Sequence, residues 1–398
     1  MSIISTSNLV GQEVNIVGWV DSKRDHGKIA FIDLRDRTAK VQVVLVPVSL
    51  DEKSKTLMSE IRTEWVLKIR GLVKARPDRL VNPDLATGGI EIEALEIEVL
   101  NTANTPIFPL DQDKNEIGEE LRLQYRYLDL RRPSMYNNLL KRHKINQFVR
   151  AFLDKEEFIE VETPILTKST PEGARDFIVP SRHKTGSFYA LPQSPQQYKQ
   201  LLMAGGVEKY FQIARCFRDE DTRKDRQPEF TQLDMELSFV SEEDVIALNE
   251  RLLIELVKSI YPEKKIQSIP FPRISYAEAM EKYGNDRPDI REDKEDENLL
   301  AFCWIIDFPQ FEKTEEGNWT FSHNPFSAPK QIYMDQLLSK QDIEQIISTQ
   351  YDIVLNGFEI GGGSIRNHKT EALKSVLEII GYEGELLEKS FGHILSAM

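Results

Sequence analysis

The sequence has little cysteine, no long apolar run and no excess of basic charge. Its two cysteines, Cys216 and Cys303, both lie in apolar runs and cannot form a disulfide framework, so we expect buried, unreactive thiols. No apolar run approaches the ~18 residues of a membrane span, and the start, MSIISTSNLVGQEV, lacks a charged segment followed by an apolar one. We therefore expect a cytoplasmic protein without a membrane partner.

The charge balance excludes one broad class of function. A net charge of −14 argues against sequence-blind binding of nucleic acid, which needs a basic surface, although it does not exclude a local basic patch. Internal repeats and low-complexity segments are absent. The chain has 398 residues, of which 40% are hydrophobic and 29% charged, and this predicts two or three globular domains.

Short β-like runs separated by turns fill residues 12–104. They are EVNIVGWV, KIAFIDLRD, KVQVVLV, EWVLKIRGLVKA and GIEIEALEIEVLN. Five strands with little helix predict a small closed barrel such as an OB-fold over residues 1–104, with a fragment of a β-sandwich as the alternative.

The pattern changes after a segment with prolines and polar residues, which we expect to be a linker at 105–125. From 126 to 398, apolar stripes at helical spacing alternate with strand-like runs near 187–191, 210–218 and 229–240. The helix expected at 241–260 begins with Ser241 and Asp244 as a capping box. This half therefore predicts an α+β domain, in which helices flank an antiparallel sheet.

The stretch FRDEDTRKDRQPEFTQLDMELSF, residues 217–239, concentrates charge between two expected strands. Residues i and i+2 of a strand share a face. Arg218 and Glu220 should therefore point to one side of the first strand, and Gln232, Asp234 and Glu236 to one side of the second. If the strands form a hairpin, this face is either a ladder of structural salt bridges or a site that holds a charged, planar ligand.

The run LPQSPQQYKQLLMAGG predicts a helix with Ser194 as its N-cap and Pro195 as its first residue. Gln196 and Lys199 then share a face of the first turn. A lysine at this end opposes the helix dipole, so a bound anion would explain it, whereas the alternative is an exposed surface lysine.

Two further segments are rich in glycine and charge. STPEGARDFIVP, at 169–180, is typical of a mobile loop. In YDIVLNGFEIGGGSIRNH, at 351–368, Asp352 and Glu359 can hold Mg²⁺ together with a phosphate ligand, and Arg366 follows three glycines. The three glycines alone are weak evidence for phosphate binding, and a flexible connection is the alternative.

Taken together, these segments resemble aspartyl-tRNA synthetases, a class II aminoacyl-tRNA synthetase family, over essentially the whole chain. EVETPILTKSTPEGARDFIVP resembles motif 1 and the loop after it, and FRDEDTRKDRQPEFTQLDMELSF resembles motif 2. QSPQQYKQLLM and NGFEIGGGSIR are similar to the segments that contact amino acid and metal. They follow one another in the family's order, behind a barrel-like domain with GWV and FIDLRDR.

The resemblance implies an ATP-dependent aspartate–tRNA ligase. Aspartate attacks the α-phosphorus of ATP, and the 3′-terminal ribose of tRNA(Asp) then takes the aspartyl group, so catalysis is positioning and charge stabilisation. Lys199 and Arg366 would pair with the side-chain carboxylate of aspartate, which explains a preference over asparagine. The other aspartate-binding residues that the resemblance implies are Glu172, Ser194, Gln196, Asp234 and His323.

The resemblance also assigns the nucleotide and tRNA sites. Arg218 and Glu220 would be catalytic, and ATP would contact both of them together with Gln227 and Glu359. Asp352 and Glu359 would hold the Mg²⁺ that accompanies ATP. Phe31 would stack on an anticodon base, and Pro164 would lie at the interface of a homodimer. The remaining residues expected at tRNA are Arg24, His26, Gln42, Glu91 and Arg226.

The sequence departs from the family's pattern in three places. The large domain that bacterial relatives insert after RPDIR is absent, and Asn324 follows His323 where two histidines are common. The chain given ends at FGHILSAM, short of the family's third motif, so we expect either a fragment or a protein that has lost this motif, with weak or no ATP–pyrophosphate exchange.

His26 bears on the choice of tRNA. A histidine at this position is common in relatives that charge both tRNA(Asp) and tRNA(Asn), so we expect tRNA(Asn) as a second substrate. Two alternatives remain open. One is a non-catalytic tRNA-binding paralogue, and the other is an asparaginyl-tRNA synthetase, against which the two cations Lys199 and Arg366 argue.

Overall fold

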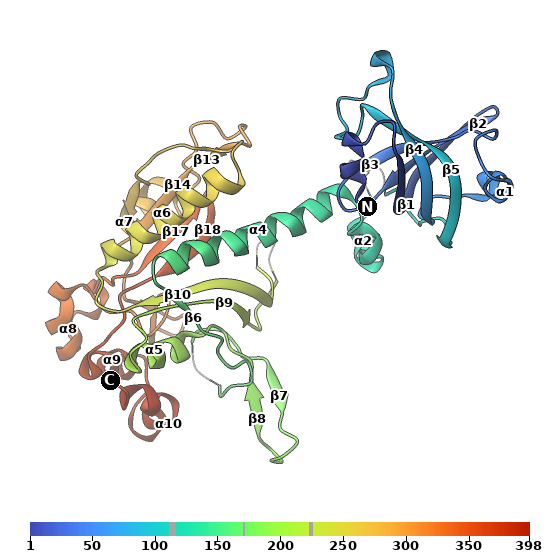
Figure 1. Cartoon of the computed structure of the whole chain (residues 1–398). Coiled ribbons are helices and arrows are strands. Elements are labelled where there is room, and N and C mark those ends of the chain that lie inside the picture. Colours follow the sequence, from blue (N-terminus) through green and yellow to red (C-terminus); the bar gives the residue numbers. More distant parts are fainter. Residues whose placement is uncertain (111–116, 170–171, 223–225) are drawn as a thin grey trace. The chain divides into compact units, whose positions relative to one another are not determined.

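The computed structural model describes residues 1–110, 117–169, 172–222 and 226–398. The chain divides into two compact units, Met1–Lys141 and Arg142–Met398 (Figure 1). Within the described residues, no helix is both long enough and apolar enough to span a bilayer.

The first unit contains a closed barrel with the strand order β1-β2-β3-β5-β4. Apolar and polar residues alternate along these strands, so every second side chain points into a core that includes Ile16, Ile32 and Ile69, all fully buried. Closure confirms the OB-fold expectation over the β-sandwich. The strands are β1 (Glu13–His26), β2 (Ile29–Arg35), β3 (Lys40–Leu45), β4 (Val66–Ala75) and β5 (Ile90–Asn101).

Helices complete the first unit. Helix α1 (Glu52–Glu60) joins β3 to β4 and begins at Asp51, whose side chain accepts a hydrogen bond from the Ser54 backbone N–H. After the barrel come α2 (Glu119–Gln124), α3 (Arg126–Asp129) and the start of α4 (Pro133–Lys155). Part of the linker predicted at 105–125, residues 111–116, lies outside the described residues, and the domain boundary stays a prediction.

The second unit is built on two sheets. In the first, β9 (Lys209–Phe217) pairs with β10 (Glu229–Leu237) as the antiparallel hairpin expected from the sequence, and β6 (Ile159–Glu160) lies parallel to β9. The second sheet has the order β12-β14-β17-β18, with ranges Arg273–Ser275, Phe302–Ile306, Tyr351–Leu355 and Phe358–Gly363. Among the described residues, neither β10 nor β18 pairs with a further strand on its outer edge.

Helices cover these sheets, as predicted for this half of the chain. Helix α6 (Glu242–Ile260) begins with the expected Ser241–Asp244 capping box, and its buried Leu248 and Leu252 pack with Phe152 of α4 and Phe211 of β9. The other helices are α5 (Gln196–Ala204), α7 (Tyr276–Tyr283), α8 (Met334–Ser339), α9 (Thr370–Ile379) and α10 (Gly384–Leu395). Short strand pairs complete the unit: β7 (Ile178–Pro180) with β8 (Phe188–Ala190), β11 (Lys265–Ile266) with β13 (Leu299–Leu300), and β15 (Phe311–Lys313) with β16 (Trp319–Phe321).

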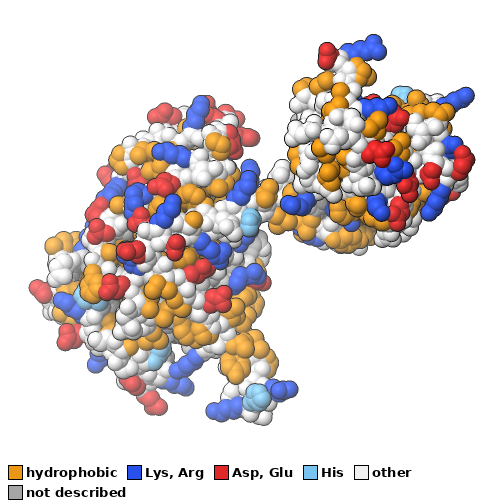
Figure 2. All heavy atoms as spheres, in the orientation of Figure 1, with side chains coloured by type: hydrophobic (Ala, Val, Ile, Leu, Met, Phe, Trp, Pro, Cys, Tyr) orange, Lys and Arg blue, Asp and Glu red, His pale blue; other side chains and the backbone are white. Residues whose placement is uncertain are grey.

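An apolar surface lies around the β7–β8 hairpin. Figure 2 shows hydrophobic side chains gathered over this hairpin and on the surface beside it. The exposed members include Ile178 at 59% and Phe188 at 56%, and Ile165 and Leu166, in the loop that precedes the hairpin, are also exposed. Apolar side chains gathered in this way are typical of a surface that another protein covers.

Candidate active site

A cavity of about 1260 Å³ lies between β10 and β18. Strand β10 contributes one wall and β18 the facing wall, and the later part of α5, from Lys199 to Ala204, adds to the lining. Eight of the residues that the sequence singled out line this cavity: Lys199, Arg218, Glu220, Arg226, Gln227, Asp234, Glu359 and Arg366. The segments from which they come lie up to 167 positions apart in the sequence, and the fold brings them together.

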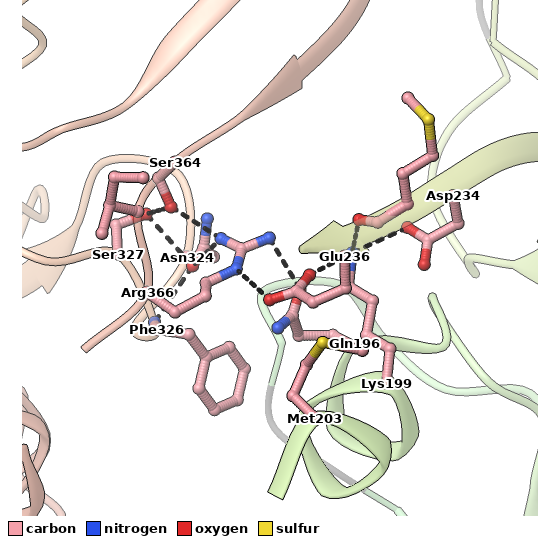
Figure 3. A network of polar contacts seen from close by, with 12 residues as sticks. Gln196, Lys199, Met203, Asp234, Glu236, Asn324, Phe326, Ser327, Ser364 and Arg366 are labelled. Atoms are coloured by element: carbon pink, nitrogen blue, oxygen red, sulfur yellow. Dashed lines mark hydrogen bonds and ion pairs between the residues drawn. The ribbon is translucent and has the colours of Figure 1, made fainter. Parts of the chain in front are cut away.

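Lys199, on α5, is a buried cation in the wall of the cavity (Figure 3). Its Nζ donates to Asp234 Oδ1 at 2.9 Å and to the Met235 carbonyl at 3.3 Å, and it forms an ion pair with Glu236 Oε2 at 3.1 Å. Burial opposes the charge of Lys199, but attraction to the two carboxylates outweighs burial and raises its pKa. The lysine is therefore a fixed cation inside the protein, and the alternative of an exposed surface lysine is excluded.

Arg366 is the second cation, and four side chains hold it. Its Nη2 donates to Gln196 Oε1 at 2.7 Å, and its Nη1 donates to Ser364 Oγ at 2.7 Å and Asn324 Oδ1 at 3.4 Å. Its Nε lies 3.9 Å from Glu236 Oε1. Figure 3 shows these groups converging on the guanidinium from three directions. Such fixed geometry suits recognition of a planar anion.

Glu236 lies between the two cations. From the sequence we placed it on the same strand face as Asp234 but assigned it no role in the site. One of its oxygens approaches Lys199 and the other approaches Arg366. Its position two residues after Asp234 on β10 puts both carboxylates on one face of the strand. This spacing was the signal that could have identified Glu236.

Three buried polar atoms in this cluster have no hydrogen-bond partner among the described residues. They are Asp234 Oδ2, Gln196 Nε2 and Arg366 Nε. Buried polar atoms are nearly always paired, so an acceptor and two donors left open in one cluster indicate where a ligand binds. The ligand would present a hydrogen-bond donor to Asp234 and acceptors to Gln196 and Arg366.

The loop before α5 ties this cluster to the segment at 172. Ser194 Oγ donates to Glu172 Oε2 at 2.9 Å and accepts from the Gln196 backbone N–H at 3.2 Å. The helix begins at Gln196 with Pro195 at the cap position, one residue later than we expected. Ser194 still satisfies a backbone donor of the first turn, as a capping residue does.

Arg218 lies just beyond the end of β9, at the base of the hairpin loop. Its backbone N–H donates to the Pro228 carbonyl at 2.8 Å, and its guanidinium lies 5.1 Å from the centre of the Phe230 ring. Its Nε donates to the Gln193 carbonyl at 3.4 Å. Glu220 and Gln227 are exposed on the same side of the cavity. The arginine is thus oriented by packing, with polar side chains beside it that a bound nucleotide can reach.

Carboxylates gather on the side of the cavity formed by β17 and β18. Asp352 is buried, and its Oδ2 lies 3.1 Å from His323 Nε2. Burial opposes a charge on His323, but the hydrogen bond and the negative charge of Asp352 raise its pKa overall. Glu359 pairs with Arg226 at 3.3 Å, and burial, followed by the negative charge of Asp352, raises the pKa of Glu359.

These carboxylates fit a magnesium site. Within the described residues, no three His, Cys, Asp or Glu side chains form a complete metal-binding cluster. Mg²⁺, however, commonly takes one or two carboxylates and completes its coordination with phosphate oxygens and water. Burial and then the negative charge of Asp352 raise the pKa of Glu359, and a cation held by these carboxylates would offset their repulsion.

The barrel brings together the residues predicted to contact tRNA. Arg24 and Phe31 are cross-strand partners on β1 and β2, and the Phe31 ring meets His26 edge to face at 5.7 Å. Arg24 also pairs with Asp33 at 3.2 Å. An aromatic ring beside a cation is a suitable surface for stacking a nucleobase.

Gln42 continues the same group of barrel residues along β3. It pairs across the strands with Asp33, its Nε2 donates to Glu91 Oε2 at 3.1 Å, and its Oε1 accepts from Arg76 at 3.2 Å. The polar groups that we expected to read base edges are therefore neighbours on adjacent strands.

Pro164 lies in the loop between β6 and β7, in the same loop as the exposed Ile165 and Leu166. It lies eight positions before Glu172 in the sequence, and it does not line the main cavity. Its predicted place at a subunit interface stays a prediction.

Comparisons with known families match both parts of the chain. Residues 118–398 match the family described as tRNA synthetases class II (D, K and N). Residues 14–100 match the family described as an OB-fold nucleic acid binding domain.

Curated relatives match almost the whole chain. The aspartate–tRNA(Asp/Asn) ligases of Natranaerobius thermophilus and Dehalococcoides mccartyi are 40% and 38% identical to it, and the aspartate–tRNA ligase of Staphylococcus saprophyticus is 36% identical. Each alignment covers 98% of this chain and 87% of the relative. The alignment to the Natranaerobius protein runs over 517 positions, so that relative contains long stretches without a counterpart in these 398 residues.

Solved structures share the fold. The asparaginyl-tRNA synthetase of Pyrococcus horikoshii, complexed with asparaginyl-adenylate, superimposes with a TM-score of 0.77 at 22% identity, covering 100% of this chain and 89% of that one. The aspartyl-tRNA synthetase of Entamoeba histolytica gives a TM-score of 0.75 at 20% identity, with coverage of 100% and 83%. At these identities the similarity concerns the fold alone.

Proposed function

The chain belongs to the class II tRNA synthetases of the D, K and N group, and from that premise we propose that it is an aspartate–tRNA ligase. In the first step, a carboxylate oxygen of aspartate attacks the α-phosphorus of ATP, and pyrophosphate leaves. In the second step, a 3′-terminal ribose hydroxyl of tRNA attacks the acyl carbon, and AMP leaves. The protein contributes positioning and charge stabilisation to both.

The observation that carries this proposal is the buried cluster of two cations with three open polar atoms. The ammonium group of an amino acid would donate to Asp234 Oδ2, and its side-chain carboxylate would meet Lys199 and Arg366. Asparagine presents a neutral amide, whose oxygen could accept from one cation while its NH₂ group would face the other, which can only donate. The site thus favours aspartate over asparagine, against the asparaginyl alternative.

The nucleotide would occupy the opposite end of the same cavity. Arg218 would stabilise charge at the α-phosphate, with Glu220 and Gln227 contacting the nucleotide. Asp352 and Glu359 would hold Mg²⁺ there. When bound, that ion would neutralise charge on the phosphate oxygens. Arg226, which pairs with Glu359 in this structure, would contact the acceptor end of tRNA.

The barrel would bind the anticodon. Phe31 would stack on one base, and Arg24, His26, Gln42 and Glu91 would contact base edges, which suits the reading of exposed single-stranded bases by an acidic protein. Two of the relatives carry names for both tRNA(Asp) and tRNA(Asn), and we propose both as substrates here.

We propose further that the protein is a cytoplasmic homodimer. The exposed apolar residues near Pro164 and on the β7–β8 hairpin support a subunit interface on this side of the catalytic unit. The concentration dependence of the sedimentation coefficient tests the assembly, and a monomer at all concentrations would contradict it.

The activity is tested by ATP–pyrophosphate exchange with aspartate, asparagine or no amino acid. We expect aspartate alone to raise exchange above the background, even if the rate of this chain is low. Exchange with asparagine would support the asparaginyl alternative, and tRNA binding without any exchange would support the non-catalytic paralogue. Charging assays with purified tRNA(Asp) and tRNA(Asn) then decide the tRNA set.

A further inference from the structure

A buried glutamine outside the predicted site contacts the residues at its metal end. Gln350 is 5% exposed and directly precedes β17. Its Nε2 donates to Asp352 Oδ1 at 2.9 Å. Its Oε1 accepts from the Ser327 hydroxyl at 3.3 Å, and the oxygen of that hydroxyl lies 2.8 Å from Ser364 Oγ. A buried amide with both ends engaged is held in one orientation.

The contact fixes the carboxylate of Asp352 on two sides. One oxygen accepts from Gln350 and the other faces His323 Nε2 at 3.1 Å, so a rotation of the carboxylate breaks at least one contact. Gly362 lies against Oδ1 so closely that a Cβ there would come within 2.3 Å. The ring of His323 packs edge to face on Phe308 at 4.5 Å. The direction of His323 therefore depends on the direction of Asp352.

The same contacts reach the amino-acid end of the cavity. Ser364 Oγ accepts from Arg366 Nη1 at 2.7 Å and lies 2.8 Å from the Ser327 hydroxyl, so two serines link Gln350 to the arginine. Among the described residues, Gln350 does not line the cavity, and its side chain forms hydrogen bonds with Asp352, Ser327 and the Tyr351 carbonyl. It therefore acts on the site through these neighbours.

We infer that Gln350 is a positioning residue that sets the direction of Asp352 and, through it, of His323. The inference deepens the proposed function and rests on it for the ligands at the two ends of the cavity. Without the amide donor, Asp352 would lose a charge-assisted hydrogen bond and turn away from His323. Mg²⁺·ATP would then bind about tenfold more weakly, the effect expected from one lost buried hydrogen bond to a charged group.

The test compares Gln350→Met with a matched control, Gln310→Met, in the full chain. Gln310 is 2% exposed and its Nε2 donates to the Ser327 carbonyl at 3.0 Å, so its loss removes a buried amide hydrogen bond without touching Asp352. If Gln350→Met folds poorly, Gln350→Leu serves, because it is also apolar and lacks the amide donor.

The direct readout is the imidazole N–H signal of His323 in ¹H–¹⁵N spectra of protein labelled at histidine, assigned with His323→Gln. We expect this signal to shift or disappear in Gln350→Met and to stay in Gln310→Met. Calorimetry with a non-hydrolysable Mg²⁺·ATP analogue should show the tenfold loss in the first variant only. An unchanged His323 signal together with unchanged analogue affinity in Gln350→Met would overturn the inference.

The two proposals fail in different ways. A wild-type protein that binds no aspartate would contradict the proposed function, whereas the His323 signal would still decide the role of Gln350. Equal losses in both glutamine variants would show that Gln350 is only part of the packing, and this result also overturns the inference.

Discussion

The buried Lys199 makes the strongest prediction about stability. Its Nζ is surrounded by three acceptors, and the side chains of Asp234 and Glu236 are only 13% and 12% exposed. Lys199→Met keeps the apolar stem but leaves these two carboxylates without their main cation. Arg366, at 3.9 Å from Glu236, can replace it only in part.

The size of the expected loss in stability follows from the burial of the ion pairs that Lys199 forms with Asp234 and Glu236. Removal of one partner from a buried ion pair destabilises proteins by about 3–5 kcal/mol, because an uncompensated charge stays inside. We therefore expect the free energy of unfolding of the catalytic unit to fall by this amount in Lys199→Met. The double variant Lys199→Met/Glu236→Gln removes one of the stranded charges and should recover about 1–2 kcal/mol of the loss.

Denaturant titration followed by tryptophan fluorescence measures these values. The matched control is Lys209→Met on β9, since Lys209 pairs with the exposed Glu157 at 3.9 Å and should change stability by less than about 1 kcal/mol. A change in Lys199→Met no larger than in the control would refute the reasoning.

The pH dependence of the Lys199 contribution has a defined sign. The pKa of Lys199 is raised above its ordinary 10.5 in the folded protein, because its two carboxylate partners outweigh the effect of burial. The contribution is therefore complete below 10.5 and is lost as the pH rises through the folded pKa. The stability difference between wild type and Lys199→Met should therefore shrink as the pH rises above 10.5.

Three further predictions concern the metal end, the sheet and the barrel. Burial and then the charge of Asp352 raise the pKa of Glu359 above its ordinary 4.5, and Mg²⁺ needs the ionised carboxylate, so Mg²⁺ affinity should fall as the pH drops through this raised pKa. Chelation of Mg²⁺ should abolish ATP–pyrophosphate exchange, and Glu359→Gln should remove the pH dependence of Mg²⁺ affinity. A wild-type protein whose Mg²⁺ affinity does not depend on pH would contradict the assignment. Gly362→Ala should reduce stability by about 1–3 kcal/mol, because its Cβ would lie 2.3 Å from Asp352 Oδ1, whereas Gly361→Ala meets its nearest neighbour at an ordinary 3.5 Å and serves as the control in thermal unfolding. Phe31→Ala should weaken tRNA binding by about 1–3 kcal/mol in a filter assay without changing aspartate affinity, and equal binding would exclude a stacking role.

Local rules predicted much of the fold. Alternation along Val14, Ile16 and their neighbours predicted the barrel strands, and the Ser241–Asp244 box predicted the start of α6. The i, i+2 rule put Asp234 and Glu236 on one face of β10, and both contact Lys199. Each of these signals acts within a few residues of the chain, where backbone geometry fixes which side chains share a face.

Tertiary contacts decided the rest. The spacing within β10 put Glu236 on the same face as Asp234, but only the folded chain shows that Lys199 and Arg366 meet Glu236 there. Gln350 looks like an ordinary polar residue before a strand, and only the folded chain shows its contact with Asp352. The hydrogen-bonded neighbours of Arg366 likewise come from segments up to 170 residues away.

The central claim is that two buried cations select aspartate, and the direct test is calorimetry with L-aspartate and L-asparagine in the absence of ATP. We predict that aspartate binds and that asparagine binds at least about tenfold more weakly, since its amide cannot accept from both Lys199 and Arg366 through two charged oxygens. Arg366→Lys should reduce this preference, because a lysine lacks the planar pair of donors. Equal affinity for the two amino acids, or tighter binding of asparagine, would contradict the account.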